Sequence, residues 1–193
     1  FGVSICYDIW FPETTRTLTA QGVEVLLHPV LTGTIDRDVE LSIARASAAM
    51  FQCYIFDING LGAGGCGRSC VVDPFGTVLY QAAGQEEIIP IEVDLTLVRR
   101  QRETGLKGLG QTQKSFRDRS VYFSIYDPTY ADTSYLYSLG PLEMPQRGSR
   151  AGLDMRPGPL DSGVSEPLGE PAGPGGMRLH AVDTINGANR SQS

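Results

Sequence analysis

Strand-like and helix-like segments alternate over the first hundred residues, and this alternation constrains the fold more than any other feature of the sequence. Apolar runs typical of buried strands lie at residues 1–6, 23–30 and 53–58. Between them the pattern predicts one helix that begins at Pro12 and a second helix over residues 36–52. Such alternation is typical of α/β folds, in which helices cover a sheet of short apolar strands.

The second predicted helix has an amphipathic pattern. The apolar residues that share one side at helical spacing are Val39, Ile43, Ala46, Met50 and Phe51. We expect this side to face the core. Acidic residues crowd the first turn, where the positive end of the helix dipole favours them.

The segment after the third strand predicts a hairpin, a strand and a short helix. The hairpin covers residues 67–82 and turns at residues 73–76, where Asp, Pro and Gly occur together. A further strand is expected over residues 86–94, and a short helix opens at Asp94.

A glycine-rich segment at residues 60–65 satisfies the G-x-G-x-x-G pattern of dinucleotide-binding loops directly after a strand. That pattern binds a pyrophosphate only where a helix follows, because the helix N-terminus supplies the N–H groups. The residues that follow, GRSCVVDP, have a strand pattern instead. We therefore interpret the segment as a flexible connection between strands.

Composition divides the chain into three regions. Residues 1–105 carry the α/β pattern, residues 106–139 form an arm rich in Phe and Tyr, and residues 140–193 are rich in Pro and Gly. The arm is expected to pack either across a neighbouring protein or on its own domain, and the sequence leaves both alternatives open. The last region has too few large apolar residues to offset its ordering entropy and is predicted to be disordered.

Charge and cysteine content argue against several classes of protein. The net charge is −6, which disfavours a nucleic-acid surface. We find no apolar run long enough to cross a bilayer and no signal peptide, so no membrane partner is expected. The four cysteines form no C-x-x-C pair, and His28 and His180 lie far apart in the sequence, so neither a disulfide framework nor a zinc site is indicated. These features favour a reducing, cytoplasmic location.

Cys6 stands at the predicted C-terminal end of the first strand, directly before a turn and a helix. Ligands of α/β proteins gather at this edge of the sheet, and nearby backbone N–H groups can stabilise a thiolate or an oxyanion. Cys6 is therefore a candidate nucleophile on a strand–turn–helix elbow. From position alone, a buried and inert structural cysteine is the more common alternative.

Five segments in series resemble the nitrilase superfamily of carbon–nitrogen hydrolases, and in particular its amidase-like branch. CYDIWFPETTR is similar to the family's nucleophile segment C-x-D-x-x-F-P-E, and QGVEVLLHPV resembles the strand that follows it. RASAAMFQCY resembles the family's second helix, GRSCVVDPFGTVL its hairpin, and IEVDLTLVRRQRE the helix that closes the domain. Together they cover residues 1–119 in the family's order, and a match in five parts is far more specific than one motif. The resemblance implies the nitrilase-type α/β fold, an α-β-β-α sandwich.

The resemblance also implies a hydrolase that cleaves a non-peptide C–N bond in a small amide, carbamoyl or, less favoured, nitrile substrate. Cys6 is the implied nucleophile that forms a thioester, and the backbone N–H of Tyr7 is expected to share the oxyanion with a lysine. The substrate-binding candidates are Trp10 and Arg16. A surface ion pair between Arg16 and Glu13 is the more common result of their spacing. No cofactor or metal is implied, and a homodimer or higher homo-oligomer is expected.

The family's glutamate base and oxyanion lysine lie upstream of the nucleophile strand, and only five residues precede Cys6. We therefore expect this chain to be the C-terminal half of the enzyme domain and to be inactive by itself. Glu13 is a weak substitute for the base, because its place in a first helical turn already explains it. Met50 and Phe51 also replace the family's Glu-Asn pair. A non-catalytic module of the same fold, used for binding or oligomerisation, is the alternative function.

Overall fold

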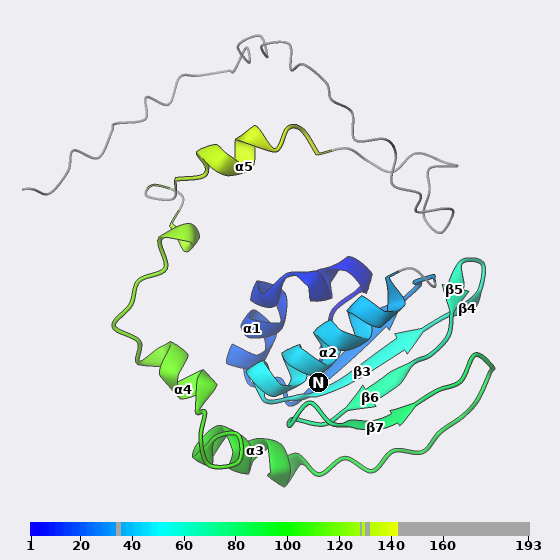
Figure 1. The fold of residues 1–193 in the computed structure, drawn as a ribbon. Helices are drawn as coiled ribbons and strands as arrows, with labels where there is room; N and C mark the ends of the chain where they lie inside the picture. The colour runs from blue at the N-terminus through cyan, green and yellow to red at the C-terminus, as the bar shows by residue number, and fades with distance from the viewer. Residues whose placement is uncertain (34–35, 128, 130–131, 143–193) are drawn as a thin grey trace, which may run out of the picture. The chain divides into compact units, whose positions relative to one another are not determined.

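A five-stranded mixed sheet organises the part of the chain that the computed structural model describes, which comprises residues 1–33, 36–127, 129 and 132–142 (Figure 1). In sheet order the strands are β1 (Gly2–Val3), β2 (Val25–Val30), β3 (Tyr54–Asn59), β6 (Cys70–Val72) and β7 (Val78–Gln81). The strands β1, β2 and β3 are parallel, whereas β6 pairs antiparallel with β3 and with β7. The predicted α/β class is confirmed.

Helices follow the strands in the predicted order. The remaining elements are η1 (Cys6–Trp10), α1 (Pro12–Ala20), α2 (Arg37–Phe51), a small hairpin of β4 (Leu61–Gly62) and β5 (Gly65–Cys66), α3 (Leu95–Thr104), α4 (Thr112–Arg117), η2 (Ser124–Tyr126) and α5 (Ser134–Ser138). The helix α1 begins at Pro12, as predicted, and ends just before Gly22, whose φ of +96° suits glycine. The short helix after Asp94 is confirmed as α3.

Two apolar clusters bury the centre of the sheet. The first, beneath α2, consists of Ile9, Leu26, Ala44, Ala48, Phe51, Cys53, Ile55, Cys70 and Val72. The second, toward α3, consists of Val25, Tyr54 and Val98. Neighbouring strand residues alternate between the clusters, because successive side chains of a strand point to opposite faces. Burial from both sides explains why β2 and β3 are almost continuously apolar in sequence.

The buried side of α2 differs from the predicted one. Val39 and Met50 are each 47% exposed, whereas Ala44, Ala48 and Phe51 are buried. The polar residues of α2 that are also buried are Arg37, Glu40 and Ser47. The prediction is confirmed for Phe51 and for Ile43, which packs against the core, and it is wrong for Val39 and Met50. The first turns of α2 bury an ion pair, and a hydrophobicity pattern cannot detect an inward-facing charge.

Two predicted strands are shorter or absent. The pattern predicts a strand over residues 1–6, but pairing ends at Val3 and the chain turns at Cys6. Residues 86–94 have a strand pattern, yet they pair with no strand of the described chain, and Ile88 is 97% exposed. A strand needs a hydrogen-bonding partner as well as a suitable sequence, and that partner is a property of the tertiary structure.

The predicted hairpin at residues 67–82 is confirmed as β6 and β7. Its turn is held by Asp73, whose Oδ1 accepts hydrogen bonds from the backbone N–H groups of Phe75 at 2.8 Å and Thr77 at 2.9 Å. Such local bonds explain why an Asp opens the turn. The glycine-rich segment before it forms the β4–β5 hairpin and is followed by a strand, as expected for a connection rather than a dinucleotide site.

Gly76 in this turn provides a stability test. Its φ is +78°, and a Cβ there would lie 2.9 Å from the carbonyl oxygen of Arg45. Gly76→Ala is therefore expected to lower the free energy of unfolding by about 2–3 kcal/mol, through backbone strain and a clash with α2. Gly108→Ala is the matched control, because Gly108 has the same φ of +78° but open space around it. Urea denaturation should show the larger loss for Gly76→Ala, and equal losses would contradict the clash.

The beginning of the aromatic arm contacts its own domain. Thr112 Oγ1 donates to the carbonyl of Met50 at 2.7 Å, and Gln113 Nε2 donates to that of Phe51 at 2.9 Å. The helix α4 is thereby tied to the C-terminal end of α2. The predicted Pro- and Gly-rich tail lies outside the described residues from residue 143 onward. Of the helices in the described ranges, none is both long and apolar enough to cross a membrane.

Candidate active site

Cys6 occupies a strained turn just after β1. Its φ is +51°, in the left-handed region that residues with a side chain seldom adopt, at a cost of roughly 1–3 kcal/mol. Asp8 closes the turn: its carboxylate accepts from the Ile5 N–H at 2.9 Å, and its own N–H donates to the Ile5 carbonyl at 3.1 Å. The thiol is free and Cys6 is half-buried. This arrangement has the features of a nucleophile elbow, which presents a side chain at the edge of a sheet.

The helix η1 places two further candidates on the same turn. The N–H of Tyr7 lies in the first turn of η1, where backbone N–H groups have no acceptor within the helix. The Tyr7 ring lies 6.0 Å from the ring of Trp10 and 5.3 Å, edge-on, from that of Phe11. Tyr7 is 64% exposed and Trp10 is 37% exposed. The turn that carries Cys6 therefore also presents an accessible aromatic surface.

The other three cysteines have different surroundings. Cys53 and Cys70 are buried, and burial raises the pKa of each thiol to about 12. Such thiols stay protonated at neutral pH and are poor nucleophiles. Cys66 is half-buried in β5, where its Sγ lies 3.5 Å from the carbonyl oxygen of Gly33. Of the four, Cys6 alone begins a helix directly after a strand.

Arg16 stacks on aromatic rings and makes no ion pair with Glu13 in the described structure. Its guanidinium carbon lies 4.2 Å from the ring centroid of Phe116 and 5.0 Å from that of Phe51. Glu13 accepts a hydrogen bond from the Tyr126 hydroxyl at 3.1 Å. The predicted surface pair is therefore wrong, because rings from α2 and α4 occupy the guanidinium.

Phe116 of the arm stacks against two arginines, Arg16 of α1 and Arg119 of the arm itself. Arg119 lies over the same ring at 3.9 Å, in addition to Arg16 at 4.2 Å. Each such cation–π contact contributes about 0.5–1 kcal/mol at a partly exposed site. Phe116→Leu is expected to lower the free energy of unfolding by about 1–2 kcal/mol, whereas Phe116→Tyr, which keeps the ring, should be close to neutral. Urea denaturation checks this, and equal effects of the two substitutions would contradict a role of the ring.

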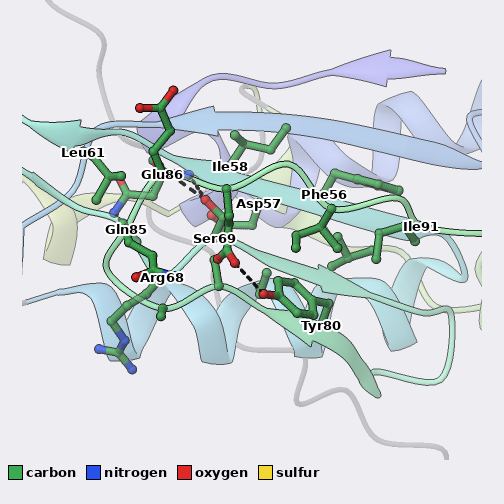
Figure 2. Close-up of a pocket in the computed structure, with 18 residues that line it drawn as sticks. Phe56, Asp57, Ile58, Leu61, Arg68, Ser69, Tyr80, Gln85, Glu86 and Ile91 are labelled. Atoms are coloured by element: carbon green, nitrogen blue, oxygen red, sulfur yellow. Dashed lines mark hydrogen bonds between the residues drawn. The ribbon is translucent and has the colours of Figure 1, made fainter.

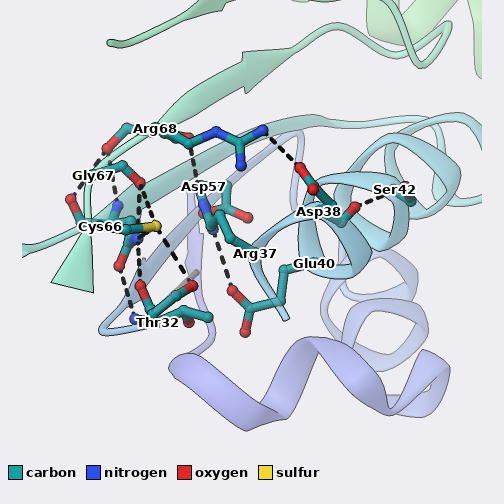
Figure 3. A network of polar contacts seen from close by, with 12 residues as sticks. Thr32, Arg37, Asp38, Glu40, Ser42, Asp57, Cys66, Gly67 and Arg68 are labelled. Carbon is teal, nitrogen blue, oxygen red and sulfur yellow. Dashed lines mark hydrogen bonds and ion pairs between the residues drawn. The ribbon is translucent and has the colours of Figure 1, made fainter. Parts of the chain in front are cut away.

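A buried polar cluster lies between the sheet and the beginning of α2. The fully or almost fully buried members are Ser4, His28, Arg37, Glu40 and Asp57. Arg37 Nη1 lies 2.8 Å from Asp57 Oδ1 and 3.2 Å from Glu40 Oε2 (Figure 3). Arg37 Nη2 donates to the carbonyl of Arg68 at 2.8 Å. His28 Nδ1 lies 2.8 Å from Ser4 Oγ and 3.2 Å from the Ser4 carbonyl oxygen.

Sequence reasoning missed this cluster. His28 and Asp57 are direct register partners in the parallel strands β2 and β3. The available signal was one ionisable residue at an inward position of each of two otherwise apolar strands. The two residues can be recognised as parts of one cluster only when the register of the strands and the position of Arg37 are known.

The buried cluster predicts a pH dependence of stability. Burial is the main cause that lowers the pKa of His28 below its ordinary 6.5, although the Asp57 carboxylate opposes it. As the pH falls, the unfolded chain protonates His28 near its ordinary pKa and the folded chain only at lower pH, so the unfolded state binds more protons. The free energy of unfolding should therefore decrease as the pH drops from about 7 to about 5.5.

The comparison of wild type with His28→Asn across that range isolates the effect. Burial raises the pKa of Asp57 above its ordinary 3.8, so this carboxyl stabilises the folded state as the pH falls and acts in the opposite direction. Urea denaturation should show that the decrease is lost in His28→Asn. An unchanged slope in the variant would contradict the assignment to His28.

A cavity of about 560 Å³ opens on the face of the sheet that Phe56 shares with α3 (Figure 2). Its lining is mostly apolar and comes from β3, Leu61, residues 67–71, β7 and residues 82–91, with Ile58, Tyr80 and Ile91 among the side chains. Cys6 is not among the residues that line it. In the described structure, the cavity and the turn that carries Cys6 are therefore separate features.

The sequence matches a known family over the segment that carries these features. Residues 1–103 match the family model of the carbon-nitrogen hydrolases. The chain is 39% identical over 101 residues to an (R)-stereoselective amidase of Pseudomonas sp, which is 49% of this chain and 36% of that protein. It is 32% identical over 112 residues to the deaminated glutathione amidase of Homo sapiens, which is 52% of this chain and 33% of that protein. The chain spans about a third of the length of these curated relatives.

Solved structures show the same relationship. The C. elegans NitFhit protein is 31% identical with a TM-score of 0.53, covering 62% of this chain and 28% of that chain. Saccharomyces cerevisiae Nit3, a member of branch 10 of the nitrilase superfamily, is 29% identical with a TM-score of 0.50, covering 52% of this chain and 40% of that chain. These similarities confirm the predicted nitrilase-type fold. The family model matches more than half of the residues of this chain, and the chain therefore belongs to the carbon–nitrogen hydrolase family.

Proposed function

We propose that the polypeptide containing this chain is an amidase-like hydrolase with Cys6 as its nucleophile. The observation that carries the proposal is the left-handed backbone of Cys6 in the turn that follows β1, within a sequence of the carbon–nitrogen hydrolase family. Strain of this kind persists only where the surrounding structure holds it, and it is concentrated at functional sites. A purely structural thiol gains nothing from such a conformation.

The proposed reaction has two steps. The Cys6 thiolate attacks the carbonyl carbon of an amide or carbamoyl group, the C–N bond breaks, and the nitrogen takes up a proton and leaves as ammonia or an amine. Water then adds to the resulting thioester, the C–S bond breaks, and the acid is released as the thiol is restored. The N–H of Tyr7 donates to the oxyanion in both steps.

Small-molecule amides and carbamoyl compounds are the proposed substrates, and nitriles are less favoured. The relatives named as amidases support this class. Trp10 is proposed to contact the substrate, because its partly exposed ring lies on the turn that carries Cys6. Substrate binding by Arg16 stays a prediction. Its guanidinium stacks on Phe51 and Phe116, so it would have to leave these rings in order to bind a substrate.

The other catalytic groups and the assembly are further parts of the proposal. The resemblance implies a glutamate base and an oxyanion lysine, and we propose that residues outside this chain supply them. Glu13 is a poor candidate for the base because it accepts a hydrogen bond from Tyr126. A homodimer or higher homo-oligomer is proposed from the same resemblance.

The intact mass of the native protein in its source cells is the first test. A mass well above 20.9 kDa is expected, and the additional residues should contain the glutamate and the lysine. The purified protein should then release ammonia or an amine from small amides. A mass equal to that of this chain, without such release, would overturn the hydrolase and favour the non-catalytic module.

A further inference from the structure

The chain leaves the sheet immediately before Cys6, at Ser4. Strand β1 pairs with β2 as far as Val3, opposite Leu27. The N–H of Ser4 still donates to the Leu27 carbonyl at 3.1 Å, but the regular ladder of backbone hydrogen bonds ends there. The next hydrogen bond to β2 is made by a side chain, that of His28.

The His28 ring contacts both polar groups of Ser4. Its Nδ1 lies 3.2 Å from the Ser4 carbonyl oxygen and 2.8 Å from Ser4 Oγ. We assign the tautomer that carries the proton on Nδ1, because a carbonyl oxygen can only accept and the first of these contacts is a hydrogen bond only in that tautomer. Ser4 is 2% exposed and His28 is fully buried, so bulk water cannot take over this bond. The ring therefore replaces the missing ladder bond two residues before the nucleophile.

Charged groups of the buried cluster act electrostatically on the ring without forming a hydrogen bond to it. Asp57 is the register partner of His28 on β3, and Arg37 of α2 joins Asp57 to Glu40. The charged groups that act on the ring are Asp57, Glu40 and Asp8 of η1. In the described chain, His28 Nε2 has no hydrogen-bond partner. The hydrogen bonding of the ring is thus directed at Ser4 alone.

We propose that His28 is a positioning residue for Cys6: its Nδ1–H bond to Ser4 fixes where the chain leaves the sheet and thereby where the Cys6 thiol lies. This inference rests on the proposed function, in which Cys6 is the nucleophile. A misplacement of the reacting atom by about 1 Å can lower the rate roughly 100-fold. His28 is fully buried and touches no substrate, so the effect falls on kcat and leaves KM unchanged.

Two amide variants of His28 test the inference in the intact polypeptide. The amide nitrogen of His28→Asn can occupy the place of Nδ1 and donate to Ser4, whereas the longer side chain of His28→Gln carries its amide to the place of Nε2. We expect His28→Asn to retain kcat within about threefold and His28→Gln to lose about 10- to 100-fold, with KM within about twofold in both. A kcat that is equal in the two folded variants would overturn the inference. Equal losses accompanied by equal losses of thermal stability would also overturn it, because they indicate a purely structural role.

Alkylation of Cys6 by iodoacetamide, followed at residue level by mass spectrometry, gives a readout that needs no turnover. The pH profile of the alkylation rate should be changed in His28→Gln and close to wild type in His28→Asn, and unchanged profiles in both would overturn the inference. The failure of the proposed function is recognised separately. If Cys6→Ala retains amide hydrolysis, the nucleophile is misassigned whatever the His28 variants show. If Cys6→Ala is inactive and the two His28 variants are alike, the positioning role alone is wrong.

Discussion

Substitution of Cys6 by alanine in the intact polypeptide is expected to lower amide hydrolysis by at least roughly 10⁴-fold. The reason is that the thioester needs a reactive thiol: Cys53 and Cys70 are buried thiols with a pKa raised to about 12, and the remaining thiol, Cys66, lies in β5. Alanine adopts the left-handed backbone at φ +51° at about the same cost as cysteine, so the turn should persist. Ammonia release from small amides measures the rate, and calorimetry should show that substrate binding is retained.

The matched control for this loss is Cys66→Ser. Cys66 is also a free, half-buried thiol, but it lies in β5, away from the strand–turn–helix elbow. The control is expected to keep its rate within about threefold. Retained hydrolysis in Cys6→Ala would show that Cys6 is not the nucleophile, and a large loss in Cys66→Ser alone would move that role to Cys66.

Arg37→Met should be the most destabilising substitution in the described domain, with a loss of about 3–5 kcal/mol in the free energy of unfolding. Arg37 lies between two buried carboxylates, 2.8 Å from Asp57 and 3.2 Å from Glu40, and is itself fully buried. Methionine fills similar space but leaves both carboxylates without a counter-charge. Urea denaturation at neutral pH measures the loss.

Arg68→Met removes an ion pair of the opposite kind and is the control. Arg68 pairs with Asp38 at 2.7 Å, but the two side chains are 38% and 77% exposed. Solvent screens such a pair, so its removal should cost at most about 1 kcal/mol. The carbonyl of Arg68 that receives the Arg37 hydrogen bond is unaffected by the substitution. Similar losses in the two variants would contradict a special role of burial in the Arg37 cluster.

The elements that the sequence predicts well are those set by neighbouring residues. Pro12 starts α1, Asp73 and Gly76 close the β6–β7 turn, and each of these residues acts within a few positions of the chain. The turn that carries Cys6 belongs to the same group, because a short apolar run followed by Pro12 already indicates a strand, a turn and a helix. Only the end of the strand was misplaced, since pairing stops at Val3.

The predictions that failed depend on partners far away in the chain. Residues 86–94 have the pattern of a strand but find no strand to pair with in the described structure. Arg16 lies one helical turn from Glu13 and yet stacks on Phe116, because the fold brings α4 against α1 and the arginine finds a larger apolar surface there. Hydrophobic periodicity contains no information about such neighbours.

The sequence by itself determined most of the order of strands and helices, the family, and the place of Cys6 between the first strand and the first helix, because local patterns and motifs are sufficient for these. Only the tertiary structure decided which side of α2 is buried and that His28, Asp57 and Arg37 form one cluster. The physical reason is that these contacts depend on the register between strands and join residues as far apart as Ser4 and His28, which are separated by 24 positions.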